Sequence, residues 1–259
     1  MSEVHQAARQ GFSTEAASYA RGRPDYPEAL LAWLTHTVSL GEGKAVVDLG
    51  AGTGKFTRML CRSGAQVTAV EPVDEMLDRL RSELPGVHAV PGTAQAMGLP
   101  SASADAVTCA QSFHWFANRE ALAEIHRVLK PGAPLALLWN VRDESVDWVA
   151  EITKIITPFE GDAPRFHKGD WRTPFAGADF SPLQVTSFPH RHVGPPGEVI
   201  LDRFLSVSFI AALPSRQKAA VQAELADLIE RHPALRGREE VEFPYRTEAF
   251  ICRSLPGRG

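Results

Sequence analysis

The stretch that most constrains the fold is a glycine-rich loop between an apolar strand and a helix. Residues 45–49 (AVVDL) form a short apolar run typical of a buried strand, and residues 50–54 (GAGTG) follow it directly. Apolar side chains then recur at helical spacing, which predicts a helix over 54–63. Glycines at such a turn let the backbone approach a ligand, and the helix N–H groups face the carboxyl edge of a parallel sheet. The segment therefore predicts a ligand site at the end of the first strand of an open α/β sheet.

The surrounding sequence from 44 to 141 repeats this alternation of strand and helix, which is typical of βαβ units. We expect further strands over 66–70, 87–90, 104–110 and 134–141, and helices over 74–84, with Asp74 as its cap, and over 119–129. The second half is less regular. We expect helices over 146–156, near 198–211 and over 215–231, a last strand over 241–252, and between them a stretch without clear structure over 157–182. A long irregular stretch is often functional, and we interpret it as part of a substrate cap.

Two acidic residues accompany the loop. Asp48 ends the first strand, and Glu71 ends the next strand, where a carboxylate can accept both ribose hydroxyls of an adenosine. A dinucleotide-binding loop would have a third glycine where this chain has Lys55. A phosphate-binding loop would have a hydroxyl residue directly after the lysine, and this chain has Phe56. The remaining alternative is that the glycines only make a tight turn.

Asp48–Gly54 together with Glu71 and Pro72 resembles the class I S-adenosylmethionine-dependent methyltransferase family. The similarity extends over about 19–141 and includes residues 92–96, 111–116 and 128–132 and the Arg-Pro-x-Tyr-Pro pattern at 23–27. Within the family, the chain is most similar to the small-molecule subgroup that includes trans-aconitate methyltransferase. The resemblance implies S-adenosylmethionine as cofactor and S-adenosylhomocysteine as product. It also implies a Rossmann-like, doubly wound, mostly parallel sheet of about seven strands, the last of them antiparallel.

The resemblance also implies residue roles. The glycine loop would lie along the methionine part of the cofactor, Glu71 would hold the ribose, and Pro72 or Val73 would pack on the adenine. Many family members have Asp in place of Thr93, so the carboxylate contact to the adenine amine is absent here, and a hydroxyl or a backbone N–H would bind the adenine edge instead. The expected cofactor-binding residues are Tyr19, Arg23, Asp48, Gly50, Ala51, Gly52, Thr53, Gly54, Glu71, Pro72, Val73, Met76, Thr93, Ala94 and Gln111.

The resemblance divides the chain into four parts. We expect an N-terminal lid segment at 1–43, a cofactor-binding α/β core at 44–141, a cap or substrate region at 142–235, and a C-terminal strand within 236–259 that completes the sheet. Five aromatic residues of the cap region suggest a partly apolar acceptor: Phe159, Phe166, Trp171, Phe175 and Phe180.

Methyl transfer from a sulfonium is an in-line displacement, which requires alignment of donor and acceptor and exclusion of water. A carboxylate acceptor needs no catalytic base, whereas a hydroxyl needs one. His114 follows the fourth strand at the ligand edge and is the candidate catalytic residue, either positioning the acceptor or removing its proton. The alternative is that it only packs under Trp115. The expected substrate-contacting residues are Tyr26, His114, Trp115 and Arg142.

Three further residues have a plainer interpretation. Arg142 either meets an acidic substrate or pairs with Asp143 or Glu144. His190 and His192 share one strand face but have no third ligand nearby, so we expect ordinary strand residues and no metal site.

Composition limits the partners. The formal net charge is −4, so no basic field favours nucleic acid, and no apolar run approaches the roughly 20 residues that span a bilayer. The N-terminus does not resemble a secretory signal, and the three cysteines show no metal or redox spacing. We therefore expect a cytoplasmic monomer or homodimer that methylates a small molecule, with O-methylation of a carboxylate or hydroxyl favoured. The alternatives are a non-catalytic S-adenosylmethionine-binding or regulatory protein and a nucleotide-dependent oxidoreductase, which Lys55 disfavours.

Overall fold

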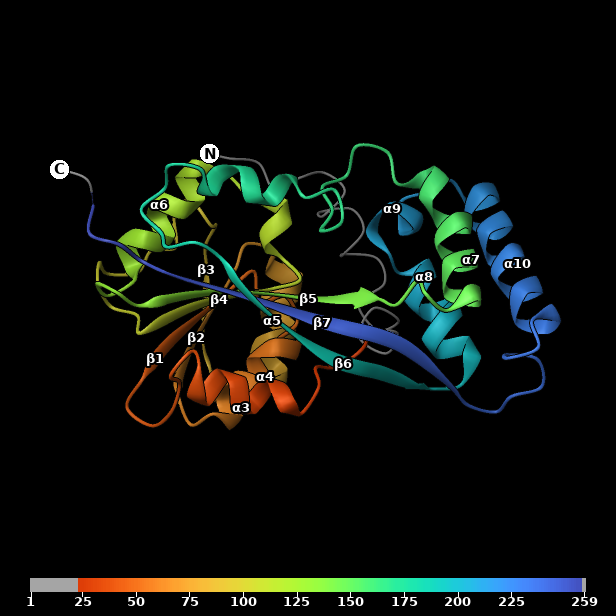
Figure 1. Ribbon diagram of the computed structural model, residues 1–259, viewed down its shortest axis with the longest axis horizontal. Helices are drawn as coiled ribbons and strands as arrows, with labels where there is room; N and C mark the ends of the chain where they lie inside the picture. The colour runs from red at the N-terminus through yellow and green to blue at the C-terminus, as the bar shows by residue number, and fades with distance from the viewer. Residues whose placement is uncertain (1–22, 258–259) are drawn as a thin grey trace.

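The apolar runs of the first half form five parallel strands in the computed structural model, which describes residues 23–257 (Figure 1). These strands are β1 (Ala45–Leu49), β2 (Gln66–Glu71), β3 (His88–Pro91), β4 (Ala106–Ala110) and β5 (Pro134–Arg142). The chain then adds two antiparallel strands, β6 (Gln184–Gly194) and β7 (Val241–Arg253). The strand order is β3-β2-β1-β4-β5-β7-β6, so the expected seven-stranded, mostly parallel sheet is confirmed.

Helices cover both faces of this sheet. Those of the sheet domain are α3 (Ala29–His36), α4 (Lys55–Arg62), α5 (Asp74–Glu83) and α6 (Arg119–Val128). The pleat of β5 shows how the two faces are separated, because successive side chains of a strand point to opposite sides. Leu137 and Trp139 pack in the same cluster as the apolar face of α6, whereas Leu138 packs in the cluster of α3 and α4. The doubly wound arrangement follows from this alternation.

The helices expected over 54–63, 74–84, 119–129, 146–156 and 215–231 are found with ends that agree to within two residues. The segment expected near 198–211 is instead divided into a π-helical turn and two short helices, and α3 was not expected. The caps also differ from expectation. Asp74 does not cap α5, because Val73 occupies the N-cap position and no side chain bonds there. Asp74 lies instead in the first helical turn, where a carboxylate complements the helix dipole. In α6, the Asn118 side chain accepts a hydrogen bond from the Ala121 N–H at 2.8 Å, which is a cap that the sequence analysis missed.

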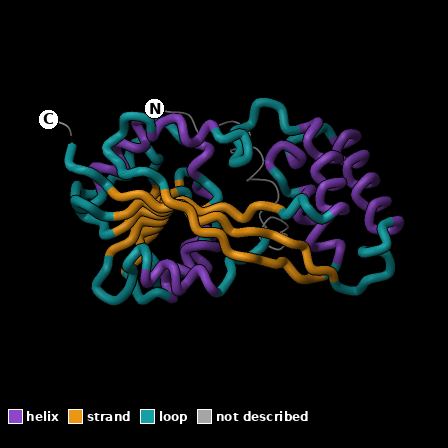
Figure 2. Tube along the Cα trace, viewed as in Figure 1, coloured by secondary structure: helices purple, strands orange, loops and turns teal. Residues whose placement is uncertain are grey.

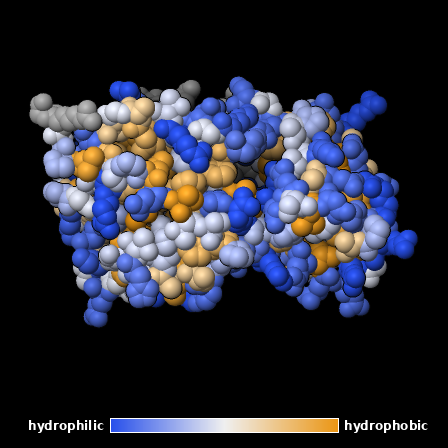
Figure 3. Space-filling model, viewed as in Figure 1, coloured by the Kyte–Doolittle hydropathy of each residue, from blue (hydrophilic) through white to orange (hydrophobic). Residues whose placement is uncertain are grey.

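A helical lobe lies at one end of the sheet. β5, β7 and β6 are longer than the other strands and extend beneath this lobe (Figure 2). The lobe contains α7 (Asp147–Ile156), a π-helical turn at Gly197–Asp202, α8 (Arg203–Leu205), α9 (Ser208–Ala211) and α10 (Ser215–Arg231). Its apolar side chains form a core of their own that includes Phe243 and Tyr245 of β7. In space-filling view, polar residues cover most of the visible face of this lobe (Figure 3).

The irregular stretch over 157–182 packs mainly against the sheet domain. Its regular parts are two 3-10 turns, Thr157–Phe159 and Asp170–Phe175. Phe166, Trp171, Phe175 and Phe180 join the core cluster beneath α6, and Trp171 lies 4.6 Å from Trp139 between ring centroids. The aromatic residues of this stretch are therefore core residues first, and only Phe166 among them lines one of the site cavities described below. The region 142–235 also contains β6, so it is not a continuous cap.

No helix between residues 23 and 257 is both long and apolar enough to cross a lipid bilayer.

Candidate functional site

The site lies where the strand order reverses. β1 and β4 are neighbours, but the chain continues from β1 to β2 on one side and from β4 to β5 on the other. The loops after β1 and β4 therefore diverge and leave a crevice, which is the usual ligand position in open α/β sheets. The Ser112 hydroxyl holds the two loops together by donating a hydrogen bond of 2.9 Å to the Leu49 carbonyl. Beside it, Gln111 has a φ of +59°, a strained conformation of the kind that often occurs at functional sites.

Glycine is required at the two ends of the loop. Gly50 has a φ of +70°, and a Cβ there would lie 2.7 Å from the Cβ of Ser112. Gly54 has a φ of +86°, and a Cβ there would lie 3.0 Å from side-chain atoms of both Leu80 and Leu84. Any other residue would therefore strain the backbone and displace a neighbour. The first glycine allows the close approach of the two loops, and the second allows α4 and α5 to pack.

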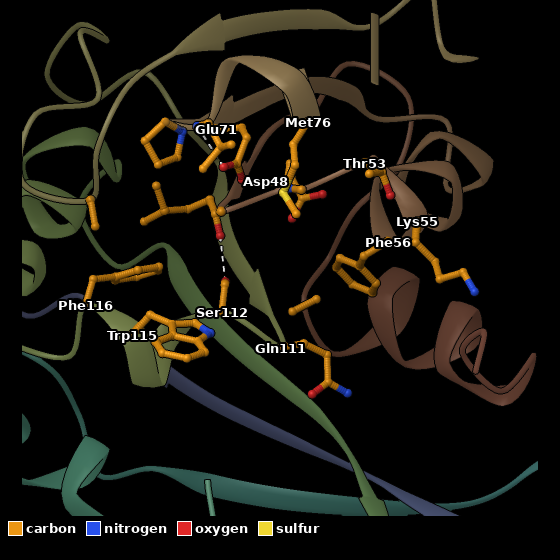
Figure 4. Close-up of a pocket in the computed structure, with 18 of the residues that line it drawn as sticks. Asp48, Thr53, Lys55, Phe56, Glu71, Met76, Gln111, Ser112, Trp115 and Phe116 are labelled. Atoms are coloured by element: carbon orange, nitrogen blue, oxygen red, sulfur yellow. Dashed lines mark hydrogen bonds between the residues drawn. The ribbon is translucent and has the colours of Figure 1, made fainter. Parts of the chain in front are cut away.

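Glu71 lies at the wall of the cavity with both carboxylate oxygens held (Figure 4). Oε2 accepts a hydrogen bond from the Gly52 N–H at 2.8 Å, and Oε1 accepts one from the Val73 N–H at 3.0 Å. Each oxygen retains a second lone pair, so both can accept further hydrogen bonds from a ligand. Burial raises the pKa of this carboxyl, against the effect of its two backbone donors.

Asp48 is buried beneath the loop. Its Oδ2 accepts a 2.7 Å hydrogen bond from the Thr57 hydroxyl of α4, and burial raises the pKa of its carboxyl to about 7. The Thr108 hydroxyl of β4 lies on the other side of the Asp48 carboxylate, 3.5 Å from Oδ1, and donates a hydrogen bond of 3.2 Å to the Val47 carbonyl. Asp48 therefore links β1 to α4 and so holds the glycine loop in position.

Most of the expected site residues meet in one cavity (Figure 4). Those that line it are Arg23, Tyr26, Asp48, Gly50, Ala51, Gly52, Thr53, Glu71, Pro72, Val73, Met76, Thr93, Ala94, Gln111 and Trp115. Gly54 does not line it, because that residue faces α5. Tyr19 lies outside the described residues. The sequence analysis missed several lining side chains, among them Lys55, Phe56, Ser112, Asn118, Asn140 and Arg203.

The segment before α3 is fixed beside the cavity by contacts distant in sequence. The Lys55 ammonium donates to the Arg23 carbonyl and lies 3.3 Å from the Asp25 carboxylate. The Asn140 amide donates to the Asp25 carbonyl at 2.9 Å, and the ring of Tyr26 meets the ring of Phe56 edge-on at 4.9 Å between centroids. No local pattern could reveal these contacts.

A second cavity adjoins the first, between the end of the sheet and the helical lobe. Five residues line both cavities: Arg23, Gln111, Trp115, Asn140 and Arg203. The second cavity is further lined by His114, Trp139, Arg142 and Phe166 from the sheet domain and by side chains of the lobe. A ligand in the first cavity would therefore share walls with a ligand in the second.

His114 faces this second cavity as a neutral imidazole. Its Nδ1 accepts a 3.0 Å hydrogen bond from the indole N–H of Trp139, so the remaining ring proton is on Nε2. Burial, followed by the charges of Arg165 and Arg23, lowers the pKa of His114 to about 3. The ring can therefore donate a hydrogen bond from Nε2, but it is a poor proton acceptor.

Comparison with known proteins gives the family. Residues 47–137 match a family model described as a methyltransferase domain. An uncharacterized methyltransferase-like protein of Schizosaccharomyces pombe is 38% identical over 250 residues, which cover 95% of this chain and 96% of that protein. An uncharacterized methyltransferase of Mycobacterium bovis is 36% identical over 236 residues, covering 91% and 92%. A solved structure from Anaeromyxobacter dehalogenans, described as a candidate type II methyltransferase, is 25% identical and covers 91% of this chain and 99% of its own, with a TM-score of 0.62.

The chain belongs to the class I S-adenosylmethionine-dependent methyltransferases. S-Adenosylmethionine is the cofactor of this enzyme class, and the chemistry of the first cavity fits it: a buried carboxylate with free lone pairs stands at the end of β2, and the backbone of Gly52 is open to the cavity. The oxidoreductase alternative has no support in these relationships.

The remaining polar side chains of the methyltransferase are partly paired. Arg142 lies 3.8 Å from Glu144, which is one of the two expected pairings, and it also lines the second cavity, so the two interpretations are compatible. Asp143 instead accepts hydrogen bonds from Ser145. His190 and His192 lie in β6 as expected, and residues 23–257 contain no group of three or more His, Cys, Asp or Glu side chains arranged to hold a metal ion.

Proposed function

We propose that this methyltransferase transfers the methyl group of S-adenosylmethionine to a small molecule bound in the second cavity. The observation that carries the proposal is the common wall of the two cavities, formed by Gln111, Trp115 and Asn140 among others. Residues on a shared wall can hold a donor and an acceptor next to each other, which is the main requirement of an in-line displacement.

In the first cavity, the glycine loop and Glu71 would hold the cofactor, whose bound sulfonium supplies the electrophilic methyl group. Glu71 would accept hydrogen bonds from the ribose hydroxyls, since its oxygens have lone pairs beyond those used by Gly52 and Val73. Val73 and Met76 are buried apolar residues of the same wall and would pack on the adenine. Thr93 and Ala94 would lie along the edge of that ring.

In the second cavity, we propose O-methylation of a carboxylate or hydroxyl, as in the small-molecule subgroup that the sequence resembles. His114 would position the acceptor by donating a hydrogen bond from Nε2, because its Nδ1 is already bonded to Trp139. A carboxylate acceptor suits this arrangement, because it needs no base and accepts the hydrogen bond directly. The cytoplasmic location and a monomeric or dimeric state remain predictions.

Calorimetric titration tests the cofactor assignment. S-Adenosylmethionine and S-adenosylhomocysteine should bind with micromolar affinity, and NADH and ATP should not. Glu71→Ala should weaken binding of S-adenosylhomocysteine by at least about 100-fold, because it removes two hydrogen bonds to a charged acceptor that contribute roughly 1.5–3 kcal/mol each. Glu75→Ala removes an exposed carboxylate of α5 and should leave the affinity unchanged. Equal affinities of the Glu71→Ala and Glu75→Ala proteins would contradict the assignment.

The role of His114 is tested by release of S-adenosylhomocysteine with a panel of small carboxylic acids and phenols. Asn can accept from Trp139 and still donate a hydrogen bond, so His114→Asn should retain most turnover while His114→Ala loses it. Since the pKa of His114 is about 3, the turnover of the unaltered enzyme should show no titration of this residue between pH 5 and 8. An equal loss in both variants would instead indicate proton removal by the imidazole.

A further inference from the structure

The second cavity has an unusual density of positive charge. Four arginines line it, Arg23, Arg142, Arg165 and Arg203, against two glutamates, Glu144 and Glu160. Arg23 lies in the segment before α3 and Arg142 at the end of β5, whereas Arg165 lies in the irregular stretch and Arg203 in α8. No motif joins them, because they are brought together only by the packing of the helical lobe onto the sheet.

The two glutamates are engaged elsewhere as well. The Glu160 carboxylate lies 3.2 Å from the His167 ring nitrogen and 3.4 Å from the Lys168 ammonium. Glu144 lies 3.8 Å from Arg142 and accepts a 2.9 Å hydrogen bond from the Thr153 hydroxyl. In the part of the chain that the structure describes, no carboxylate forms an ion pair with Arg165 or Arg203.

Two of the guanidinium groups have buried donors without a partner. Among residues 23–257, no acceptor meets the Nε of Arg165 or the Nε and Nη1 of Arg203, although these atoms are buried. Arg165 makes one long contact of 3.4 Å from its Nη2 to the Ser208 hydroxyl. Buried donors are normally bonded, so unpaired charged donors at the wall of a cavity favour the binding of an anionic ligand.

Aromatic rings hold these guanidinium groups in place. Arg165 lies over the ring of Phe209 at 4.5 Å from its centroid, and both Arg142 and Arg203 lie over the ring of Phe204, at 5.6 and 5.4 Å. A guanidinium that stacks on a ring keeps its N–H groups at the edge, where a carboxylate or phosphate can bind in bidentate fashion. The side chains are therefore oriented before any ligand arrives.

We propose that the methyl acceptor carries a carboxylate or phosphate group that Arg142, Arg165 and Arg203 bind in the second cavity. The inference rests on the proposed function, since it concerns the molecule that receives the methyl group. Burial and the mutual repulsion of the arginines lower the pKa of Arg165 to about 10 and also lower that of Arg142. An anion bound among the arginines would replace their mutual repulsion by attraction and would accept hydrogen bonds from the unpaired donors, so the cavity selects for negative charge.

Calorimetry with the full chain saturated with S-adenosylhomocysteine tests the inference at low ionic strength. The probes are succinate, citrate, inorganic phosphate and the neutral succinamide. At least one anion should bind with a dissociation constant below 1 mM, and succinamide should not bind. Arg165→Gln and Arg142→Gln should each weaken anion binding at least 10-fold, because each removes a charged donor from the second cavity. Neither residue lines the first cavity, so both variants should bind S-adenosylhomocysteine as the unaltered protein does. Arg231→Gln, an exposed residue of α10, is the matched control and should bind as the unaltered protein does.

A thermal-shift measurement separates loss of the site from loss of the fold. The anion that binds should raise the melting temperature of the unaltered protein but not that of Arg165→Gln, and without anion the variant should melt no lower, since it loses an uncompensated buried charge. Preference for succinate and citrate over phosphate identifies a carboxylate, and the reverse identifies a phosphate. The inference is overturned if none of the three anions binds, or if the Arg165→Gln and Arg142→Gln variants bind the anion as tightly as the unaltered protein does. Failure of S-adenosylhomocysteine to bind contradicts the proposed function instead.

Discussion

Asp48 makes the stability of this protein depend on pH in the direction opposite to most carboxylates. Burial raises the pKa of its carboxyl to about 7, whereas an unfolded chain has a value near 4. Between these values, the native state holds a proton that the unfolded state has released. The contribution of Asp48 to the free energy of unfolding therefore falls as pH rises from about 4 to 7 and is constant above about 8. A difference of about 3 pKa units corresponds to ~4 kcal/mol.

The difference in the free energy of unfolding between the Asp48→Asn variant and the unaltered protein isolates this effect, because the other titrating groups are common to both. Chemical unfolding across pH 4–9 should show the variant gaining up to ~4 kcal/mol relative to the unaltered protein as pH rises from 4 to 7. Asp105→Asn is the control, because the Ala45 N–H and then Lys130 lower the pKa of Asp105. The free energy of unfolding of Asp105→Asn should differ from that of the unaltered protein by a constant amount above pH 5, and this difference should change only at lower pH. A flat difference for Asp48→Asn across the whole range would refute the reasoning.

Two further substitutions test how the loop and the N-terminal segment are held. Gly50→Ala should lower the free energy of unfolding by ~2–4 kcal/mol, because alanine is strained in the left-handed backbone conformation and its Cβ clashes with Ser112. Gly43→Ala is the control: Gly43 has a φ of +76° but no atom within 4 Å of the position of a Cβ, so this variant should lose only ~1 kcal/mol. Equal losses in the two variants would contradict the clash. Lys55→Met should release Arg23 and Asp25 from α4 and weaken S-adenosylhomocysteine binding about fivefold in calorimetry, the effect of roughly 1 kcal/mol; unchanged affinity would show that this tether does not shape the cavity.

The sequence predicted those parts of the fold that depend on local patterns. The bounds of β1 and α10 agree with expectation at both ends, because an apolar run and a long periodic helix are strong signals. Glu71 was placed at the cavity for the same reason, since a residue that ends a parallel strand must lie at the ligand edge. His190 and His192 were expected on a strand, but the bounds of the antiparallel edge strand β6 were not predicted, because its alternating exposed residues and its proline resemble an irregular stretch.

Only part of the second cavity was predicted: His114, Trp115 and Arg142 were expected at the substrate, but the other lining residues share no spacing with them. Arg165 and Arg203 belong to segments that read as solvent-exposed charge until the lobe packs against the sheet. Trp139 illustrates the same difficulty, because this buried residue lines the second cavity and also donates a hydrogen bond to His114. The side chain that fixes the tautomer of a candidate base is thus 25 residues away from it in sequence.

The end of β5 explains how one strand serves both cavities. Trp139 points to the face of α6 and orients His114, while the next residue, Asn140, donates to the Asp25 carbonyl and accepts a 2.6 Å hydrogen bond from the Thr247 hydroxyl of β7. Arg142 follows two residues later in the second cavity. Because side chains alternate along a strand, a change in the register of β5 would disturb the segment before α3, the imidazole and the arginine together. The antiparallel pairing of β5 with β7 over nine residue pairs fixes that register, so the last strand of the sheet maintains the alignment of cofactor site and acceptor site.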